Sequence, residues 1–171
     1  IASYTDPNAR AGRFYAYGNN FQSTTNLMTP EMKKMTEEFF DKYQDPNTGT
    51  WASIPCYNAT NGIHKIGAVY NAIGAPLKNV EKMVESCIEI VSWTVDEKPI
   101  GSGVDLYNAW SCFPYIYTNV RKHNPNGEQM IKEIKDRIFE NASDMIIIAR
   151  DQIAGFRRPD GSYGYSRTGS C

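Results

Sequence analysis

The chain has 171 residues, of which 41% are hydrophobic, so it can form one sizeable core or part of a larger one. Eighteen basic and nineteen acidic residues leave a formal net charge of −1, which gives no electrostatic basis for binding nucleic acid or an anionic membrane. No apolar run approaches the roughly 20 residues needed to cross a bilayer. The composition favours a neutral or amphipathic ligand and predicts neither a nucleic-acid nor a membrane partner.

The first 28 residues show no helical period, and they predict an irregular or extended N-terminal segment. The helical pattern starts at Thr29, a good N-cap, followed by Pro30 in the first helical position. A helix over 30–43 then places its apolar side chains on one face. The sequence therefore predicts two regions, an irregular segment over 1–28 and a helical domain over 29–171.

Further helices are predicted with two kinds of surface. Two carry almost no charge, which indicates enclosed helices, and two are amphipathic, which indicates half-exposed ones. Pro114 is expected to kink its helix or to separate the first turns from the rest. The predicted helices alternate in chain order between enclosed and amphipathic, over 59–73, 79–92, 106–121 and 128–153.

A repeated unit runs through these helices. Tyr-Asn-Ala at 57–59 opens one enclosed helix, and the same three residues at 107–109 open the next, fifty positions later. An aromatic turn at 45–51 precedes the first, and a similar turn lies at 158–164. Periods of about 20–50 residues signal repeat architectures, whose units cannot bury their apolar faces alone. The sequence therefore predicts an all-α fold built from repeated antiparallel helical hairpins.

The turns at 45–51 and 159–165 resemble the Asp-Gly-Ser-aromatic turns of α/α-toroid proteins. That superfamily includes terpenoid cyclases, protein prenyltransferases, and several polysaccharide lyases and glycoside hydrolases. Residues 158–166, together with 61–65, are similar to uncharacterised bacterial toroid proteins with prenyltransferase- and cyclase-like repeats. The resemblance covers about residues 29–171 and implies that the hairpins form part of a larger α/α-toroid. It implies little about chemistry, because one fold of this kind hosts many activities.

Two activities of that superfamily lack their motifs in this chain. The Asp-x-Asp-Asp acid motif of squalene-type cyclases is absent, and so is the Asp/Cys/His zinc set of protein prenyltransferases. The four cysteines are widely spaced without a Cys-x-x-Cys pair, and we expect neither a metal ion nor another cofactor. Cys87 and Cys112 fall among apolar helical positions that are typical of small buried thiols, while disulfide bonds stay open as an alternative.

The strongest candidate for chemistry is the start of the helix at 59–73. Asn61, His64 and Lys65 share a face of this helix, and Tyr57 and Asn58 open it. The set resembles that of toroid polysaccharide lyases, in which Asn helps to neutralise a uronate carboxylate, His or Tyr removes the C5 proton, and Tyr protonates the leaving oxygen. The resemblance implies His64 and Tyr57 as catalytic residues and the other three as substrate-binding ones. Alternatively, the cluster only satisfies polar groups at a buried helix start.

The equivalent position one repeat later holds Asp105, Tyr107, Asn108 and Trp110. Asp105 could act as acid or base, as in toroid unsaturated-glucuronyl hydrolases, but it is also a good N-cap. Tyr107 and Asn108 are predicted to bind substrate, and Trp110 could either stack on a sugar or pack in the core. The C-terminal turn adds three candidates that could bind a carboxylated sugar or fill the gap between hairpins, namely Arg158, Tyr163 and Tyr165.

These candidates favour a carbohydrate-active or carbohydrate-binding α/α-toroid protein that carries out β-elimination or hydrolysis on an acidic glycan or another small polar ligand. The alternatives are a non-catalytic helical-repeat scaffold, whose aromatic rim binds a ligand or partner chain, and a cyclase relative without its acid. The enclosed helices at 59–73 and 106–121 are expected to lie side by side. If a ligand site exists, one rim or cavity should hold Tyr57, Asn61, His64, Asp105, Tyr107 and Tyr163.

The last expectation concerns the edge of the predicted hairpin array. The third aromatic turn reaches Tyr165, and the chain ends at Cys171, where the next enclosed helix is expected to begin. The helix at 128–153 would then keep part of its apolar stripe, from Ile138 to Ile153, without a partner. Each fully exposed Ile or Met forfeits roughly 1.5–3 kcal/mol of burial. We therefore expect an apolar edge that is covered by the remainder of the toroid or by a second copy in a dimer.

Overall fold

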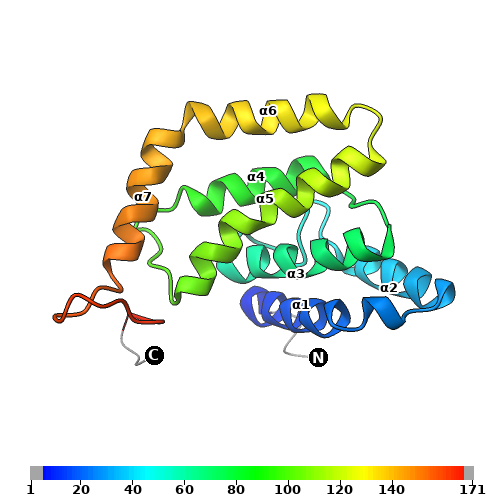
Figure 1. Cartoon of the computed structure of the whole chain (residues 1–171), viewed down its shortest axis with the longest axis horizontal. Helices are drawn as coiled ribbons and strands as arrows, with labels where there is room; N and C mark the ends of the chain where they lie inside the picture. The colour runs from blue at the N-terminus through cyan, green and yellow to red at the C-terminus, as the bar shows by residue number, and fades with distance from the viewer. Residues whose placement is uncertain (1–5, 168–171) are drawn as a thin grey trace.

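The computed structural model of the chain describes residues 6–167, apart from the side chains of residues 7 and 8. The described residues form helices and no strand, which confirms the all-α fold class (Figure 1). Between 6 and 167 no helix is long and apolar enough to span a membrane. In chain order the α-helices are α1 (Pro7–Gln22), α2 (Pro30–Tyr43), α3 (Tyr57–Ile73), α4 (Val80–Val91), α5 (Gly103–His123), α6 (Gly127–Glu140) and α7 (Ala142–Ala154), with a short 3-10 helix, Thr25–Leu27, between α1 and α2.

The prediction of an irregular segment over 1–28 is wrong, because α1 occupies most of it. Its apolar face is short, with Phe14, Tyr17 and Phe21 at helical spacing, and it also contains small residues. Ala11 and Phe14 are buried, and Gly18 packs so closely on α3 that an added Cβ would lie 2.8 Å from Ile66. Glycine is a weak helix former that allows such close backbone approach. Packing against α3 therefore stabilises a helix that the local pattern does not predict.

Three helices, α1, α3 and α5, lie side by side and run in the same direction. Gly12 of α1 faces Asn58 near the start of α3, and Gly18 faces Ile66 farther along. The contacts between α3 and α5 advance in the same way, from Asn61 with Asp105 to Asn71 with Asn119. The prediction that 59–73 and 106–121 are neighbours is confirmed.

The middle helix, α3, is enclosed as its low charge predicts. Most of its side chains are buried, whereas only Thr36 and Phe40 are buried in α2. Gly74 ends α3 in the left-handed conformation, with φ of 79°. The helix that follows the aromatic turn is therefore more buried than 30–43, as expected.

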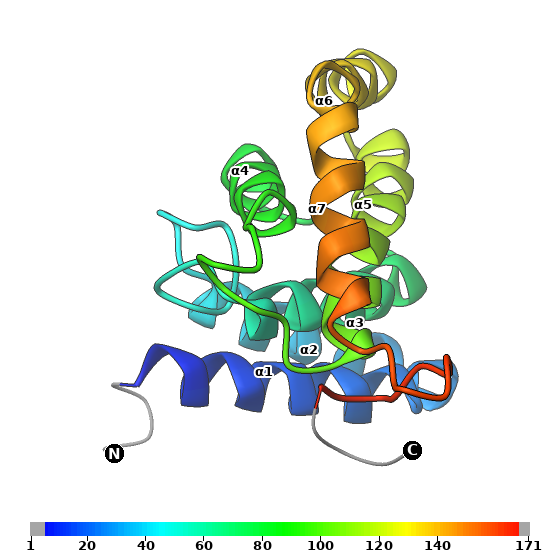
Figure 2. The same cartoon turned by 90° about the vertical axis from the view of Figure 1, so that its left-hand side faces the viewer.

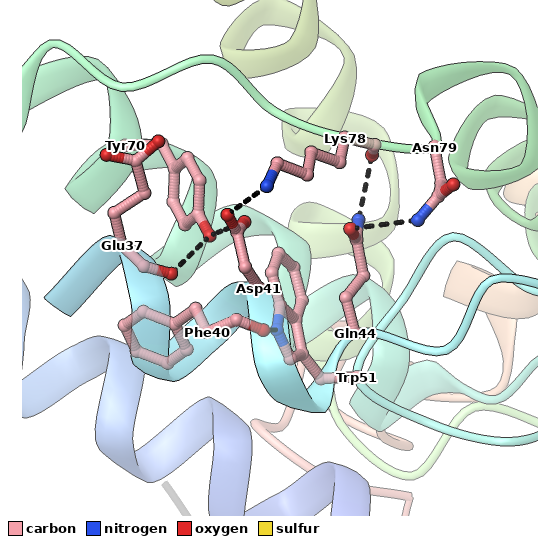
Figure 3. Close-up of polar contacts among 8 residues, drawn as sticks. All are labelled: Glu37, Phe40, Asp41, Gln44, Trp51, Tyr70, Lys78 and Asn79. Carbon is pink, nitrogen blue, oxygen red and sulfur yellow. Dashed lines mark hydrogen bonds and ion pairs between the residues drawn. The ribbon is translucent and has the colours of Figure 1, made fainter. Parts of the chain in front are cut away.

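A polar cluster ties the end of α2 to the end of α3 (Figure 3). The hydroxyl of Tyr70 donates to Oδ1 of Asp41 at 2.7 Å, and Lys78 pairs with the second oxygen of the same carboxylate. Behind it, the indole of Trp51 is buried and donates to the backbone oxygen of Phe40 at 2.9 Å. The aromatic turn at 45–51 therefore packs into the core between α2 and α3.

Helix α5 is continuous through Pro114, so the alternative in which Pro114 cuts off its first turns is wrong. Proline lacks the N–H that would bond to the carbonyl of Trp110, but it fits the helix without ending it. The helix also begins earlier than predicted, because Ser102 and Asp105 form a capping box at its start.

The single helix predicted over 128–153 is two helices that meet at Asn141. The side chain of Asn141 donates to the backbone oxygen of Arg137 at 2.9 Å, and its own carbonyl accepts from Met145 at 3.0 Å. From this point α7 turns away from α6 and descends beside α5 (Figure 2). The turn brings Met145 and Gln152 into the core, which a straight continuation of α6 would carry away from it.

Helix α7 keeps large apolar side chains in contact with solvent. Ile146 is 67% exposed, and Ile147 and Ile153 are also exposed. Ile138, by contrast, packs against the core, so the exposed stripe is shorter than the sequence predicts. Exposed apolar side chains are therefore present on α7 in the described part of the chain, and the edge of a hairpin array stays a prediction.

Candidate functional site

A chain of side-chain hydrogen bonds crosses the interface between α3 and α5 near their N-terminal ends. Asn61 donates from Nδ2 to Oδ1 of Asp105 at 3.0 Å, and Asn108 donates to Oδ1 of Asn61 at 2.9 Å. Asn58 accepts a longer contact from Asn61 at 3.4 Å. Asn61 and Asn108 are both buried. The structure thus brings four of the predicted site residues into one network.

The carboxylate of Asp105 is engaged on both oxygens. Oδ2 accepts from the backbone N–H and from the hydroxyl of Ser102, each at 3.0 Å, while Oδ1 accepts from Asn61. This is a complete capping box at the start of α5. The geometry gives Asp105 a structural role, and its role as catalytic acid or base stays a prediction.

His64 lies one turn along α3 from Asn61 and is only 6% exposed. Two tyrosines of α5 meet its ring edge to face, Tyr115 with ring centroids 5.0 Å apart and Tyr107 at 5.8 Å. The Nδ1 atom is buried without a hydrogen-bond partner. Burial, and secondarily the neighbouring charge of Lys65, lowers the pKa of His64 below its usual 6.5. The imidazole is therefore neutral at pH 7.

A buried ring nitrogen without a partner needs an explanation, because most buried polar atoms in proteins are hydrogen-bonded. A neutral imidazole with one unpaired nitrogen can accept a proton or a hydrogen bond from a bound group. His64 is therefore neutral and has an unpaired ring nitrogen, but this nitrogen is buried and His64 lines neither cavity of the groove described below. A general base also needs to reach the proton that it removes, so a role of His64 as base stays a prediction.

Tyr57 faces a different neighbourhood from His64. Its hydroxyl donates to the backbone oxygen of Lys98 at 2.9 Å, and its ring stands edge-on to Trp93 at 5.5 Å. Burial, with a contribution from the charge of Asp105, raises the pKa of Tyr57 to about 12. These contacts hold the loop that precedes α5, and a catalytic role for Tyr57 stays a prediction.

An open aromatic groove runs between α5 and α7. It consists of two adjoining cavities of about 530 and 610 Å³ that share Trp110, Ile153 and Tyr163. Tyr107 lines the first cavity and is 64% exposed, so it lies between the groove and the ring of His64. The groove is mainly apolar, with Ser111 and Arg150 as its polar side chains. We refer to it below as the α5–α7 groove.

The C-terminal turn, residues 156–166, closes one end of this groove. Its backbone folds back on itself, with the N–H of Gly164 donating to the oxygen of Phe156 at 2.9 Å. Tyr163 lines the groove, while the guanidinium of Arg158 packs over Gly164. Tyr165 is exposed and its backbone oxygen accepts from Gly103 at 3.1 Å, which fixes the turn against the start of α5.

Two predicted ligand-binding residues of α3 face α1 rather than the groove. The amide of Asn58 lies 3.7 Å from where a Cβ on Gly12 would stand, and the Cβ of Lys65 lies 2.9 Å from that position on Gly18. Both side chains are half-buried. Their positions support a packing role, and ligand binding by either stays a prediction.

Sequence reasoning missed two residues that shape this region. Tyr115 contacts the ring of His64, and its place in the predicted enclosed helix indicated core packing only. Gln152 is 1% exposed and bonds to the backbone of Ile100, Trp93 and Lys98. A glutamine on an apolar helical face is a weak signal that could have been noticed, because buried amides are usually fully bonded.

No family model, curated protein or solved structure matches this chain. Within residues 6–167 no three His, Cys, Asp or Glu side chains gather as a metal site.

Proposed function

We propose that this chain is a carbohydrate-active protein of α/α-toroid type that binds an acidic glycan in the α5–α7 groove and cleaves it by β-elimination. The supporting observation is that Tyr107 joins the two parts of the site, since it contacts the neutral ring of His64 and lines the groove. Exposed aromatic rings provide flat apolar surfaces on which sugar rings can stack.

The helix arrangement supports the toroid part of this proposal. In such folds one layer of parallel helices faces inward, and α1, α3 and α5 are parallel neighbours. Trp93, two residues after α4, packs on Tyr57 at the start of α3, so α4 returns along α3. We propose that α1/α2, α3/α4 and α5/α6 are successive hairpins of one array, with the apolar face of α7 at its edge.

In the proposed reaction His64 takes the C5 proton of a uronate ring. The C4–oxygen bond breaks, a C4–C5 double bond forms, and the leaving oxygen receives a proton. We assign that proton to the hydroxyl of Tyr107, because Tyr57 already donates to a backbone oxygen and Tyr107 is exposed beside His64. Positioned general acids and bases each contribute about 10²–10⁴-fold to rate.

The test is a panel of uronate-containing and neutral glycans incubated with the protein. Ultraviolet absorbance reports the unsaturated uronate product of elimination, and reducing ends report hydrolysis. We expect unsaturated product from at least one uronate glycan. His64→Gln and Tyr107→Phe should each lower its rate by about 100-fold or more, in line with the general-base contribution.

Tyr43→Phe is the matched control for Tyr107→Phe, because Tyr43 lies at the end of α2 and lines neither cavity. Its rate should equal that of the unmodified protein. New reducing ends without the unsaturated chromophore would show that the reaction is hydrolysis and not elimination. Absence of both products with every glycan would rule out the proposed activity.

A non-catalytic scaffold is the second candidate, and one observation favours it. Asp105 and Tyr57, two of the three residues predicted to be catalytic, are held by structural hydrogen bonds. In that case the glycan binds without turnover. Trp110→Ala should then weaken binding about tenfold, as loss of a stacking surface does, while His64→Gln leaves affinity unchanged in a calorimetric titration.

A further inference from the structure

Two cysteine thiols meet in the interface between α4 and α5. The sulfur atoms of Cys87 and Cys112 are 3.3 Å apart, and both side chains are fully buried. The two residues are 25 positions apart in the chain. Their helices are consecutive in the chain and are joined by the loop that carries Trp93 and Lys98. Neither thiol belongs to the α5–α7 groove or contacts His64.

We propose that Cys87 and Cys112 are a modification site at which a disulfide bond cross-links α4 to α5. A disulfide has an S–S bond of about 2.05 Å, so each sulfur needs to move by well under 1 Å from its thiol position. A small rotation of each side chain supplies a movement of this size.

The local contacts of the thiols fit this cross-link. Cys112 carries one S–H hydrogen and has two acceptors in reach, the oxygen of Ala109 at 2.9 Å and the sulfur of Cys87 at 3.3 Å. It can satisfy only one of them well, and a thiol is a weak donor. A disulfide needs no donor, so oxidation removes two buried S–H groups without leaving a strong polar group unpaired.

The oxidant in this reaction is a small-molecule disulfide such as oxidised glutathione, and the reaction is thiol–disulfide exchange. One cysteine loses its proton and attacks a sulfur of the small disulfide, which gives a mixed disulfide and releases one glutathione thiolate. The second cysteine loses its proton, attacks the protein sulfur of the mixed disulfide, and releases the other thiolate. Two protein thiols are oxidised, the glutathione disulfide is reduced to two thiols, and these take up the two protons.

Burial decides when this exchange can happen. It raises the pKa of Cys87 well above its usual value, and both sulfurs are shielded from solvent in the folded molecule. The thiols therefore react while α4 and α5 are still coming together. Once packed, the disulfide is protected from reductants, so it acts as a structural link rather than a reversible switch.

The test uses the protein itself, unfolded and reduced, then refolded in a glutathione redox buffer. Free thiols are blocked under denaturing conditions, and peptide mapping by mass spectrometry identifies linked pairs. We expect a Cys87–Cys112 linked peptide in most molecules. The oxidised form should melt about 5–10 °C above the same protein refolded in reductant, because the cross-link restricts the unfolded chain.

Cys56→Ser is the matched control, since Cys56 is a buried free cysteine like Cys87 and Cys112 but lies outside this pair. It should keep the linked peptide, while Cys87→Ser should lose it. Comparing the oxidised and reduced forms of one sequence keeps the test valid even if Cys87→Ser does not fold. Oxidised refolding that leaves both thiols open to alkylation, or that links either of them to a different cysteine, would overturn the proposal.

Discussion

Asn61 on α3 and Asp105 on α5, forty-four residues apart, are joined by a 3.0 Å hydrogen bond from the amide nitrogen to the carboxylate. The bond connects a predicted substrate-binding residue to a predicted catalytic one. The same carboxylate caps α5 through Ser102. One side chain therefore fixes both the start of α5 and its register on α3.

We expect Asp105→Asn to destabilise the fold by about 1–3 kcal/mol, because its amide would place a donor opposite donors from Asn61 and Ser102. Chemical denaturation with a circular dichroism readout measures the change. Asp136→Asn, which removes only an exposed ion pair with Lys132, should change stability by less than about 0.5 kcal/mol. An Asp105→Asn variant that is as stable as the original but inactive would restore Asp105 as a catalytic residue.

Because of His64, the free energy of unfolding should decrease as the pH is lowered. The folded pKa of His64 lies below 6.5, so the unfolded chain binds a proton first as the pH drops. The free energy of unfolding should therefore decrease below about pH 6.5 and level off below the folded pKa. Denaturation midpoints at a series of pH values measure this, and nuclear magnetic resonance titration of the ring gives the folded pKa directly.

His64→Gln should flatten that part of the pH profile. A ring pKa for His64 at or above 6.5 would contradict the neutral imidazole on which the proposed elimination depends.

Substitutions at Gly49 and Gly161 should distinguish the cost of a steric clash from the cost of backbone strain. Both have positive φ, 66° at Gly49 and 86° at Gly161, but a Cβ at Gly49 would lie 2.2 Å from the backbone nitrogen of Met83, while Gly161 has open space around it. Gly161→Ala should cost only the strain of a left-handed residue, about 1–2 kcal/mol. Gly49→Ala should cost distinctly more, or prevent folding, because the turn would be pushed off α4. Equal losses in thermal denaturation would show that the 45–51 turn is not held against α4.

Tyr70→Phe should destabilise the protein by about 1–2 kcal/mol, because it removes the hydroxyl group that donates a hydrogen bond to the carboxylate of Asp41. Lys78→Met removes the other partner of Asp41, but Lys78 is largely exposed and its loss should change stability by less than about 1 kcal/mol. The two partners are shown side by side in Figure 3. Denaturant titration measures the loss of stability in both variants. A larger loss for Lys78→Met would show that the ion pair stabilises the protein more than the hydrogen bond from Tyr70 does.

Ionisation of Tyr70 should make the stability of the protein depend on pH in the alkaline range. Burial, with the hydrogen bond to Asp41, raises the pKa of Tyr70 above its usual 10. The unfolded chain then loses this proton first, so stability should decline as the pH rises above 10, and Tyr70→Phe should remove part of that decline. A stability profile between pH 8 and 11 that is identical in the two proteins would contradict this.

Helical periodicity predicted α2, α3 and α4 to within two residues at each end, because apolar spacing, the cap at Thr29 and the left-handed Gly74 are local signals. The low charge of α3 also predicted its enclosure. These features depend on side chains within a turn or two of each other. The Tyr-Asn-Ala motif opens α3 at 57–59, but at 107–109 it lies in the second turn of α5, so the prediction that it opens both helices is wrong for the second.

Tertiary packing decided the rest. Helix α1 is stabilised by packing against α3, where Gly18 allows a close approach to Ile66 and Phe14 is buried in the core. The break at Asn141 exists because Met145 and Gln152 gain burial when α7 turns beside α5. The neutral, unpaired state of His64 and the meeting of Cys87 with Cys112 depend on atoms more than twenty residues away. Sequence alone determines which residues are available, and only the fold determines which of them meet.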